Sequence, residues 1–366
     1  MINLSKHPNN QGSLLIVSIL IIFILGIIGL ATITITNTEL MISRNEKLSQ
    51  KSFYMAESGI EHAKTEILVD EDNFPMNGSM SSGEGSYVVT CSSPQVIQNA
   101  TMNSSEWIVK QYCLNSTGRY ENAQKKIQVV LLKKSIPVNA DAALGIYTGK
   151  ANATTETTLQ GSPSINGDDF GLPSDFNCSG VGCNVPLGSD VNGTEGLYFE
   201  KTNYDLKVQK EDQLNPYPEK VGNGTYSNEY WQDLAANLTP LADSTYNSTV
   251  SDQTLGTRDV PEISVLESNS TLSGTVNGAG ILIVDGNVRC TGNFHFEGQV
   301  IILSNTSDVK LFTAGTPYIY GSVVVAGSEN PEISIKGNAN IKYSQKALEN
   351  ANNMSKFLEV VSWKEI

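Results

Sequence analysis

The stretch Leu14–Ile35, LLIVSILIIFILGIIGLATITI, decides the class of this chain. No Asp, Glu, Lys or Arg occurs between Lys6 and Glu39. About 20 apolar residues, each rising ~1.5 Å along a helix, cover the ~30 Å hydrocarbon core of a membrane. A cleavable secretory signal has an apolar run of only about 7–15 residues before a small-residue cleavage site, and no Ala-x-Ala site follows this one. The stretch therefore predicts a single membrane-spanning helix over residues 14–35.

The helix is predicted to continue beyond the apolar stretch in amphipathic form. Apolar residues recur at steps of three, four and seven, with charged and polar residues between them. These apolar residues are Leu40, Met41, Leu48, Met55, Ala56, Ile60, Ala63 and Ile67. Asn73-Phe74-Pro75, followed by Asn77-Gly78, predicts the end of the helix. The expected helix covers residues 13–72; a membrane anchor with a coiled-coil-like stalk would give the same pattern.

Two short motifs flank this helix. Gln11-Gly12-Ser13 precedes the apolar run, and YMAESGIEHA at residues 54–63 closes the amphipathic half. Over about residues 10–68, the sequence resembles the N-terminal domain of PilX-type minor pilins of type IV pili. The resemblance implies that a prepilin peptidase removes a leader, residues 1–12, by cleavage between Gly12 and Ser13, and that Ser13 is then N-methylated. It also implies partners: other minor and major pilins and an inner-membrane assembly platform.

One position departs from the pattern of most pilins. With Ser13 as the first mature residue, the fifth is Val17, where most pilins have a Glu that pairs with the terminal amine of a neighbouring subunit. A buried amine needs such a partner, which valine cannot provide. Among pilin-like proteins, the lack of this Glu marks PilX-like and type II secretion K-like minor subunits. The resemblance therefore favours a position at the fibre tip over that of a major pilin.

After the helix, residues 73–136 are expected to form a small antiparallel sheet. Strand-like runs cover residues 85–91, 106–114 and 125–133, and turn-forming residues at 92–94 and 115–118 separate them.

Residues 137–345 show a repeat that predicts a β-solenoid head. The runs Ile281–Val284, Val300–Leu303 and Val323–Ala326 begin 19 and 23 residues apart, and each is followed by two further short runs. Three short strands per rung of about 20 residues are typical of a β-solenoid. The expected corners are Gly292, Gly298, Gly321 and Gly337. An antiparallel sandwich is the alternative.

Between the early strands and these rungs, residues 160–270 are expected to form a loop-rich insertion, and residues 346–366 a C-terminal tail. The insertion is predicted to hold one short helix, 229–242, with Trp231, Leu234 and Leu238 on one side. Nearby tyrosines could contact a surface or a glycan, or could pack against the solenoid. They are Tyr198, Tyr204, Tyr217, Tyr226 and Tyr230.

The cysteines and sequons suit an exported protein. Cys91 and Cys113 lie in candidate neighbouring strands, Cys178 and Cys183 lie in a Gly-rich loop, and Cys290 is left over. The first two pairs are disulfide candidates in an oxidising compartment; five free thiols are the alternative. Thirteen Asn-x-Ser/Thr sequons follow the leader. They favour a glycoprotein, and a bias towards Asn, Ser and Thr is the alternative.

The sequence contains no signal for catalysis. G-x-S-x-G, H-E-x-x-H, Walker A and G-x-G-x-x-G motifs are absent, and only three His occur. With 24 Lys+Arg against 38 Asp+Glu, the net charge of −14 argues against nucleic acid as a partner of the head. Asp168, Asp169 and Asp285 stand out, but no Arg accompanies them at rung spacing. We expect no enzyme activity, cofactor or metal site.

The sequence thus predicts an α+β protein: a long N-terminal transmembrane and amphipathic helix, a small antiparallel sheet, then a mainly β, solenoid-like head. The expected function is that of a minor pilin-like subunit at the tip of a type IV pilus or related filament, acting in assembly initiation and surface adhesion. It would be a single-pass membrane protein before assembly and extracellular afterwards. The alternatives are a permanently membrane-anchored surface binding protein and a β-helix polysaccharide-cleaving enzyme.

Overall fold

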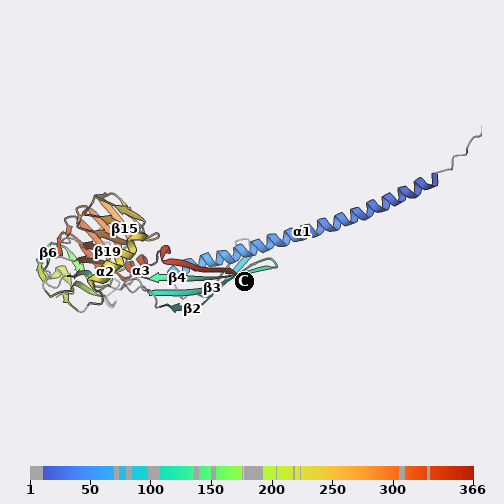
Figure 1. Ribbon diagram of the computed structural model, residues 1–366. Helices are drawn as coiled ribbons and strands as arrows, with labels where there is room; N and C mark the ends of the chain where they lie inside the picture. Colours follow the sequence, from blue (N-terminus) through green and yellow to red (C-terminus); the bar gives the residue numbers. More distant parts are fainter. Residues whose placement is uncertain are drawn as a thin grey trace, which may run out of the picture.

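The long helix and the two β regions that follow it form a rod with a broad head (Figure 1). A computed structural model describes residues 11–69, 74–79, 85–97, 108–135, 140–149, 154–174, 176, 193–202, 204–216, 219–222, 224–304, 310–327 and 330–366. Helix α1 spans Gln11–Val69 without a break. Its first half projects away from the rest of the chain, and its second half lies on a small sheet. The long helix, the antiparallel sheet and the mainly β head are all as predicted.

The small sheet contains five strands in the order β1-β2-β3-β4-β24, and all of its pairings are antiparallel. The strands are β1 (Met76–Ser79), β2 (Gly85–Val96), β3 (Ile108–Tyr120), β4 (Ala123–Ser135) and β24 (Leu358–Glu365). The last of these comes from the far end of the sequence. The predicted C-terminal tail, 346–366, is therefore a short helix, α3 (Gln345–Asn352), followed by a strand that returns to this small sheet.

Close contact between α1 and strand β3 explains why the turn predicted at 115–118 is wrong. Gly118 lies against the helix backbone: a Cβ on it would stand 2.2 Å from the carbonyl oxygen of Ser52 and 2.2 Å from the nitrogen of Ala56. Ser116 donates a buried hydrogen bond of 2.7 Å to the carbonyl oxygen of Ala56. These small residues resemble a turn in sequence, but here they let the helix approach the sheet. The strand runs on, and the turn lies at Glu121, whose φ is 49°.

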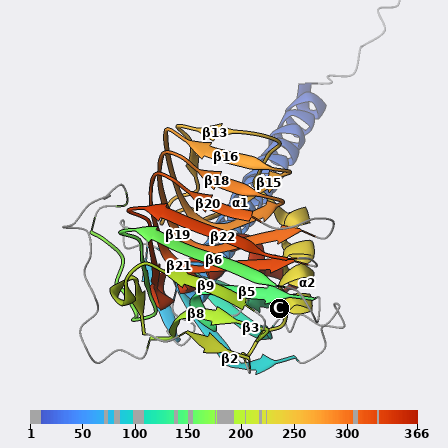
Figure 2. The ribbon, with the colours of Figure 1, turned by 90° about the vertical axis from the view of Figure 1, so that its left-hand side faces the viewer.

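The head is a solenoid of parallel strands whose turns have three faces (Figure 2). The first face contains β12 (Ser244–Tyr246), β15 (Glu262–Glu267), the second halves of β17 (Thr275–Asp285), β19 (Asn293–Ser304) and β21 (Thr316–Gly327), then β5 (Ala142–Thr148), β8 (Glu195–Phe199) and β11 (Lys220–Val221). The second contains β13 (Val250–Ser251), β16 (Ser270–Ser273), β18 (Val288–Cys290), β20 (Lys310–Thr313), β22 (Glu332–Gly337), β6 (Thr155–Gly161) and β9 (Tyr204–Val208). The third contains β14 (Thr254–Leu255), the first halves of β17, β19 and β21, β23 (Asn340–Tyr343), β7 (Ser164–Asn166) and β10 (Leu214–Asn215). The repeat at 281–343 therefore does form rungs.

The order of the rungs in space differs from their order in sequence. The chain enters the solenoid near its middle, because β5, β6 and β7 pair with β21, β22 and β23, the last rung to be made. It then adds β8 to β10 on one side, crosses to the opposite end, and winds back from β12 to β23. Much of the insertion predicted as loop-rich, 160–270, thus consists of solenoid strands; residues 177–192 lie outside the described part. The sequence did not show this because these strands are short and irregularly spaced.

Two columns of glycine form corners of the solenoid. Gly298 and Gly321 have φ of 138° and 132° and stack on Gly280, so each of the long strands bends at the same level. A Cβ on Gly292 would stand 2.1 Å from the carbonyl oxygen of Gly274 in the second column. Stacked rungs leave no room there for a side chain. The corner roles predicted for the glycines of the repeat are consistent with this geometry.

Two apolar layers stabilise the head. The interior of the solenoid is filled by side chains from all three faces, among them Phe294, Phe296 and Leu282. A second layer covers the outside of the first face, where helix α2 (Asn228–Leu238) packs through its apolar side. Trp231, Leu234 and Leu238 are all buried, as predicted. The Ser227 side chain accepts a hydrogen bond from the Tyr230 N–H and so caps the start of this helix.

Candidate assembly site

The first half of α1 is bare. Every described side chain from Leu14 to Lys47 is exposed, whereas the second half of the helix buries Ala56, Ile60, Ala63 and Ile67 against the sheet. Part of α1 is long and apolar enough to cross a membrane. So large an apolar surface needs a lipid or protein cover.

Four hydroxyl side chains in the bare half donate hydrogen bonds within the helix itself. The hydroxyl of Thr32 donates to the carbonyl oxygen of Ile28 at 2.9 Å, and that of Thr34 donates to Leu30 at 2.7 Å. Ser18 and Thr38 make the same kind of bond to the preceding turn. Such bonds remove the need for water, which suits a helix buried in lipid or among other helices.

The residues predicted to act in processing and assembly lie at the start of this bare helix. Helix α1 begins at Gln11, so Gly12 and Ser13 lie in its first turn. Val17 lies just over a turn further along, with 52% of its surface exposed. The surface around Val17 is apolar, with Leu14, Leu20 and Ile21 also exposed. No carboxylate occurs in this part of the described helix before Glu39.

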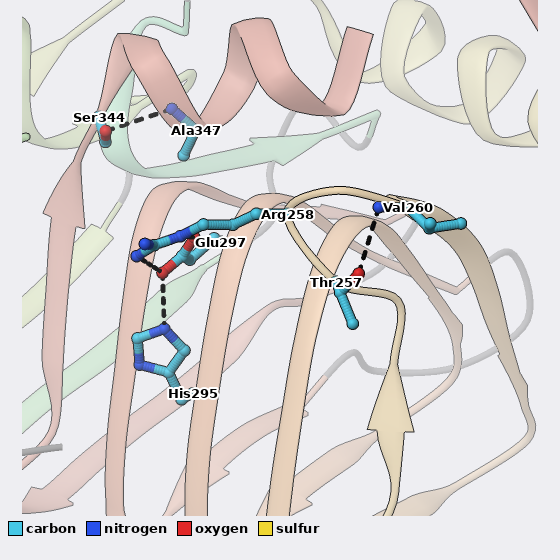
Figure 3. A network of polar contacts seen from close by, with 7 residues as sticks. All are labelled: Thr257, Arg258, Val260, His295, Glu297, Ser344 and Ala347. Atoms are coloured by element: carbon cyan, nitrogen blue, oxygen red, sulfur yellow. Dashed lines mark hydrogen bonds and ion pairs between the residues drawn. The ribbon is translucent and has the colours of Figure 1, made fainter. Parts of the chain in front are cut away.

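A buried polar cluster on the third face of the head was not foreseen (Figure 3). Both oxygens of the Glu297 carboxylate accept from Arg258: Oε2 from Nε at 2.5 Å and Oε1 from Nη2 at 2.6 Å. His295 Nε2 lies 2.9 Å from Glu297 Oε1. His295 alternates with Phe294 and Phe296 along β19 and so faces away from them, yet it is only 2% exposed. The paired Arg258 ties its loop to strand β19, which is a structural role.

The acidic residues that stand out in sequence do not form a site with this cluster. Asp168 accepts a hydrogen bond of 2.7 Å from the Asn215 side chain, and Asp169 is buried and accepts from the Gln345 N–H at 2.9 Å. Asp285 is exposed at the end of β17. Within the described residues, no group of three or more His, Cys, Asp or Glu could hold a metal ion.

The tyrosines near α2 pack against the head. Tyr198 is buried, and Tyr226 and Tyr230 are partly buried against the same outer layer. Asp141 organises this region by accepting from the Tyr147 hydroxyl at 2.9 Å and the Thr225 N–H at 2.7 Å. Burial and the Asp141 charge raise the pKa of Tyr226 to about 12. Of the two interpretations offered by the sequence, packing is therefore the one that these three tyrosines support; Tyr217 lies outside the described residues.

The described cysteines are free thiols, so the structure contains no Cys91–Cys113 disulfide. Cys113 is opposite Ser92, and Cys91 is opposite Leu114. Neighbouring residues of a strand point to opposite faces of the sheet. Leu114 is buried, so its side of β3 is the one that packs against the helix. The one-residue offset thus directs the two cysteines to different faces. Cys178 and Cys183 lie outside the described residues.

One comparison with known proteins matches the helix. Residues 11–61 match the family described as PilX N-terminal. No curated protein matches the chain. A crystal structure of the competence-associated pilin ComZ from Thermus thermophilus is similar at 11% identity, covering 87% of this chain and 97% of that chain, with a TM-score of 0.26. A glycosylated ice-binding protein, LeIBP, from an Arctic yeast is similar at 14% identity, covering 57% of this chain and 93% of that chain, with a TM-score of 0.20.

At these TM-scores, neither structure bears on what this chain does. The family match covers most of α1, including Gly12, Ser13 and Val17. The predicted resemblance to PilX-type minor pilins is therefore confirmed for this helix, whose residues 11–61 match the PilX N-terminal family.

Proposed function

We propose that this protein is a minor pilin that initiates a type IV pilus or related filament, stays at its tip, and displays the solenoid head for adhesion. The observation that carries the proposal is the bare apolar helix with Val17 at the fifth mature position. A leader, residues 1–12, would be removed by a prepilin peptidase, and Ser13 would be methylated. The helix would anchor the subunit in the inner membrane until an assembly platform moves the subunit into the filament.

The cost of burying charge supports the proposed tip position. Inside a bundle of apolar helices, an unpaired ammonium costs several kcal/mol. An interior subunit avoids this cost because its Glu pairs with the amine of a neighbour. This chain offers Val17 instead, so a neighbour's amine that meets this position would be left unpaired. Its own Ser13 amine can still pair with the Glu of another pilin. The Ser13 amine of this chain can thus be paired, whereas a neighbour's amine that meets Val17 cannot. This asymmetry is expected for a terminal subunit.

The head supports display at a surface. Its solenoid forms the end of the molecule farthest from the bare helix (Figure 1). Deletion of residues 140–345 is expected to reduce attachment of cells without removing any polysaccharide hydrolysis. Glycans would fit the exposed sequon residues Asn77, Asn247 and Asn269.

The substitution Val17→Glu tests the tip assignment, with Val17→Leu as the apolar control. An unpaired amine at about 3 kcal/mol corresponds to about 100-fold discrimination against interior positions. Immunogold labelling of wild-type and Val17→Leu filaments should mark one end. Val17→Glu should raise the copy number and spread the label along the filament. Even labelling of wild-type filaments would exclude the tip position.

A further inference from the structure

A groove lies on the outside of the first face of the head, between α2 and the strands that this helix covers. We call it the α2 groove; its volume is about 180 Å³. Val265, Ile283 and Leu303 line it from three successive rungs, and all three are buried. Helix α2 lies alongside these rungs (Figure 2). The groove thus has an apolar lining that packed elements hold in place on both sides.

Two alanines of α2 leave space in the groove. Ala235 and Ala236 both line it, and Ala236 is exposed. The large apolar residues of the same helix, such as Trp231, are directed into the layer against the solenoid instead. Sites for drug-sized ligands have volumes of about 300–1,000 Å³, so a groove of this size suits a single side chain better than a larger molecule.

Two carboxylates line the same groove side by side. Glu267 and Asp285 are opposite each other in the parallel register of β15 and β17, and both are exposed. Their neighbours Leu266 and Val284 point into the solenoid, so the carboxylates point outward. Adjacent strands lie about 4.8 Å apart, which holds the two like charges close together. Across the part of the chain that the structure describes, neither carboxylate has a hydrogen bond or an ion pair.

This arrangement favours a cation as the occupant of the groove. Like charges that face each other across two strands destabilise a sheet, and a positive group that bonds to both carboxylates removes the repulsion. The whole chain, with a net charge of −14, also attracts basic partners over a longer range.

The apolar lining narrows the choice among cations. Long basic side chains have a positive head on an apolar stem, and they bury the stem while the head keeps its polar partners. Arginine suits two adjacent carboxylates best, because its planar guanidinium has five N–H donors arranged as a fork. A lysine ammonium is a more strongly hydrated point charge and loses more on leaving water.

We propose that the α2 groove binds an arginine side chain of a protein on the surface to which the head attaches, an assignment that rests on the proposed function. The stem of the arginine lies against Ile283 and Ala236, and its guanidinium bridges Glu267 and Asp285. Because two rungs supply the two carboxylates, the contact depends on the assembled solenoid. The partner is a protein with an exposed arginine in a basic segment.

Binding of a model peptide by the full-length protein in detergent tests this contact. The peptide carries one arginine among glycines and serines on a biosensor surface; a matched peptide carries citrulline, which keeps the shape of arginine and lacks its charge. The wild type should bind the arginine peptide about tenfold more tightly than the citrulline peptide. The double variant Glu267→Gln, Asp285→Asn should lose this difference.

A matched double variant controls for net charge. Glu211→Gln, Asp212→Asn changes the charge of the chain by the same amount, at two exposed residues of the turn after β9. It should bind the arginine peptide as the wild type does. The variant without the groove carboxylates should also melt no lower than wild type, since it removes a repulsion between like charges.

A neutral substitution gives a further readout. Ala236→Leu fills the groove without changing the charge, and leucine is a good helix former, so α2 should stay intact. This variant should bind the arginine peptide about tenfold more weakly than wild type.

Three results would overturn the inference. They are equal binding of the arginine and citrulline peptides by wild type, equal losses in the groove and control double variants, and stabilisation of the protein by Ca²⁺ together with no binding of the arginine peptide. Attachment of cells is measured separately with the deletion of residues 140–345. If that deletion abolishes attachment while one of these results is found, the proposed function stands and only the groove contact is lost. If attachment survives the deletion while the arginine peptide binds, the adhesive function is lost and the arginine site stands.

Discussion

Adding a single methyl group at Gly118 should loosen the attachment of α1 to its sheet. In Gly118→Ala the new Cβ would stand 2.2 Å from Ser52 O and 2.2 Å from Ala56 N. Both are helix backbone atoms, so the clash cannot be relieved by a rotamer change. The helix has to retreat by about 1 Å, and a gap of that size forfeits a quarter to a half of each dispersion contact. Overpacking costs about 1–3 kcal/mol, and we expect the upper end, about 3 kcal/mol.

Hydrogen exchange of the full-length chain in detergent measures this effect. Amides in residues 52–67, protected by packing on the sheet, should exchange about 100-fold faster in Gly118→Ala, since 3 kcal/mol is about two factors of ten. Peptides from the solenoid should be unchanged. The control is Thr117→Ala on the same strand, whose side chain is directed away from the helix by alternation. Unchanged exchange in Gly118→Ala, or equal acceleration in both variants, would refute the close-approach argument.

Other predictions concern the head and its buried groups. Gly298→Ala places a Cβ on a residue with φ of 138°, and this Cβ would stand 2.0 Å from the carbonyl oxygen of Gly280. The substitution should destabilise the solenoid by about 3 kcal/mol or more. A thermal melt, followed by circular dichroism, that matches wild type would contradict this. Burial lowers the pKa of Lys342 from 10.5 to about 8, so the unfolded chain holds a proton that the folded chain lacks between these values. The contribution of Lys342 to stability therefore rises from pH 8 towards 10.5, and Lys342→Met should remove that rise in urea unfolding at pH 7.5–9.5; parallel curves for the two proteins would disprove it. Burial raises the pKa of Cys290 to about 12 and that of Cys91 to about 11, so iodoacetamide at pH 8 should leave Cys290 unmodified until the protein is unfolded; rapid native labelling would show that the thiol is accessible.

The features that sequence could predict are those with a strong local period. The continuous apolar stretch predicts the first half of the helix. The amphipathic pattern predicts the second half to within a few residues of the observed end at Val69. The rungs at 281–343 were predictable because each repeats the same order of short runs, with glycine at the same corners. The α2 helix could be read from Trp231, Leu234 and Leu238 because their spacing alone defines a buried side.

Features that depend on contacts between distant segments could not be predicted. Strand β24 joins the small sheet only because Leu358 and its neighbours meet β4, more than two hundred residues earlier in the chain. The insertion of β5 beside β21 is likewise a pairing between distant segments that no local pattern shows. Arg258 and Glu297 lie 39 residues apart and are joined only by the winding of the solenoid.

In the candidate assembly site, the roles of the processing and assembly residues stay predictions. Gly12, Ser13 and Val17 could be located because the pilin-like motif fixes them by position along the helix. The contact between α1 and β24 was missed because Phe53 and Trp363, whose ring centroids lie 5.8 Å apart, are separated by nearly the whole chain.

The mature N-terminus tests the central claim, that this protein is processed and assembled as a pilin. The protein is purified from the membranes and filaments of the cells that produce it, and its first residues are identified by mass spectrometry. A chain that begins at an N-methylated Ser13, and an uncut precursor retained in the membrane for Gly12→Val, are the predicted results. A native protein that still begins at Met1 would contradict the account and leave a permanently anchored surface protein in its place.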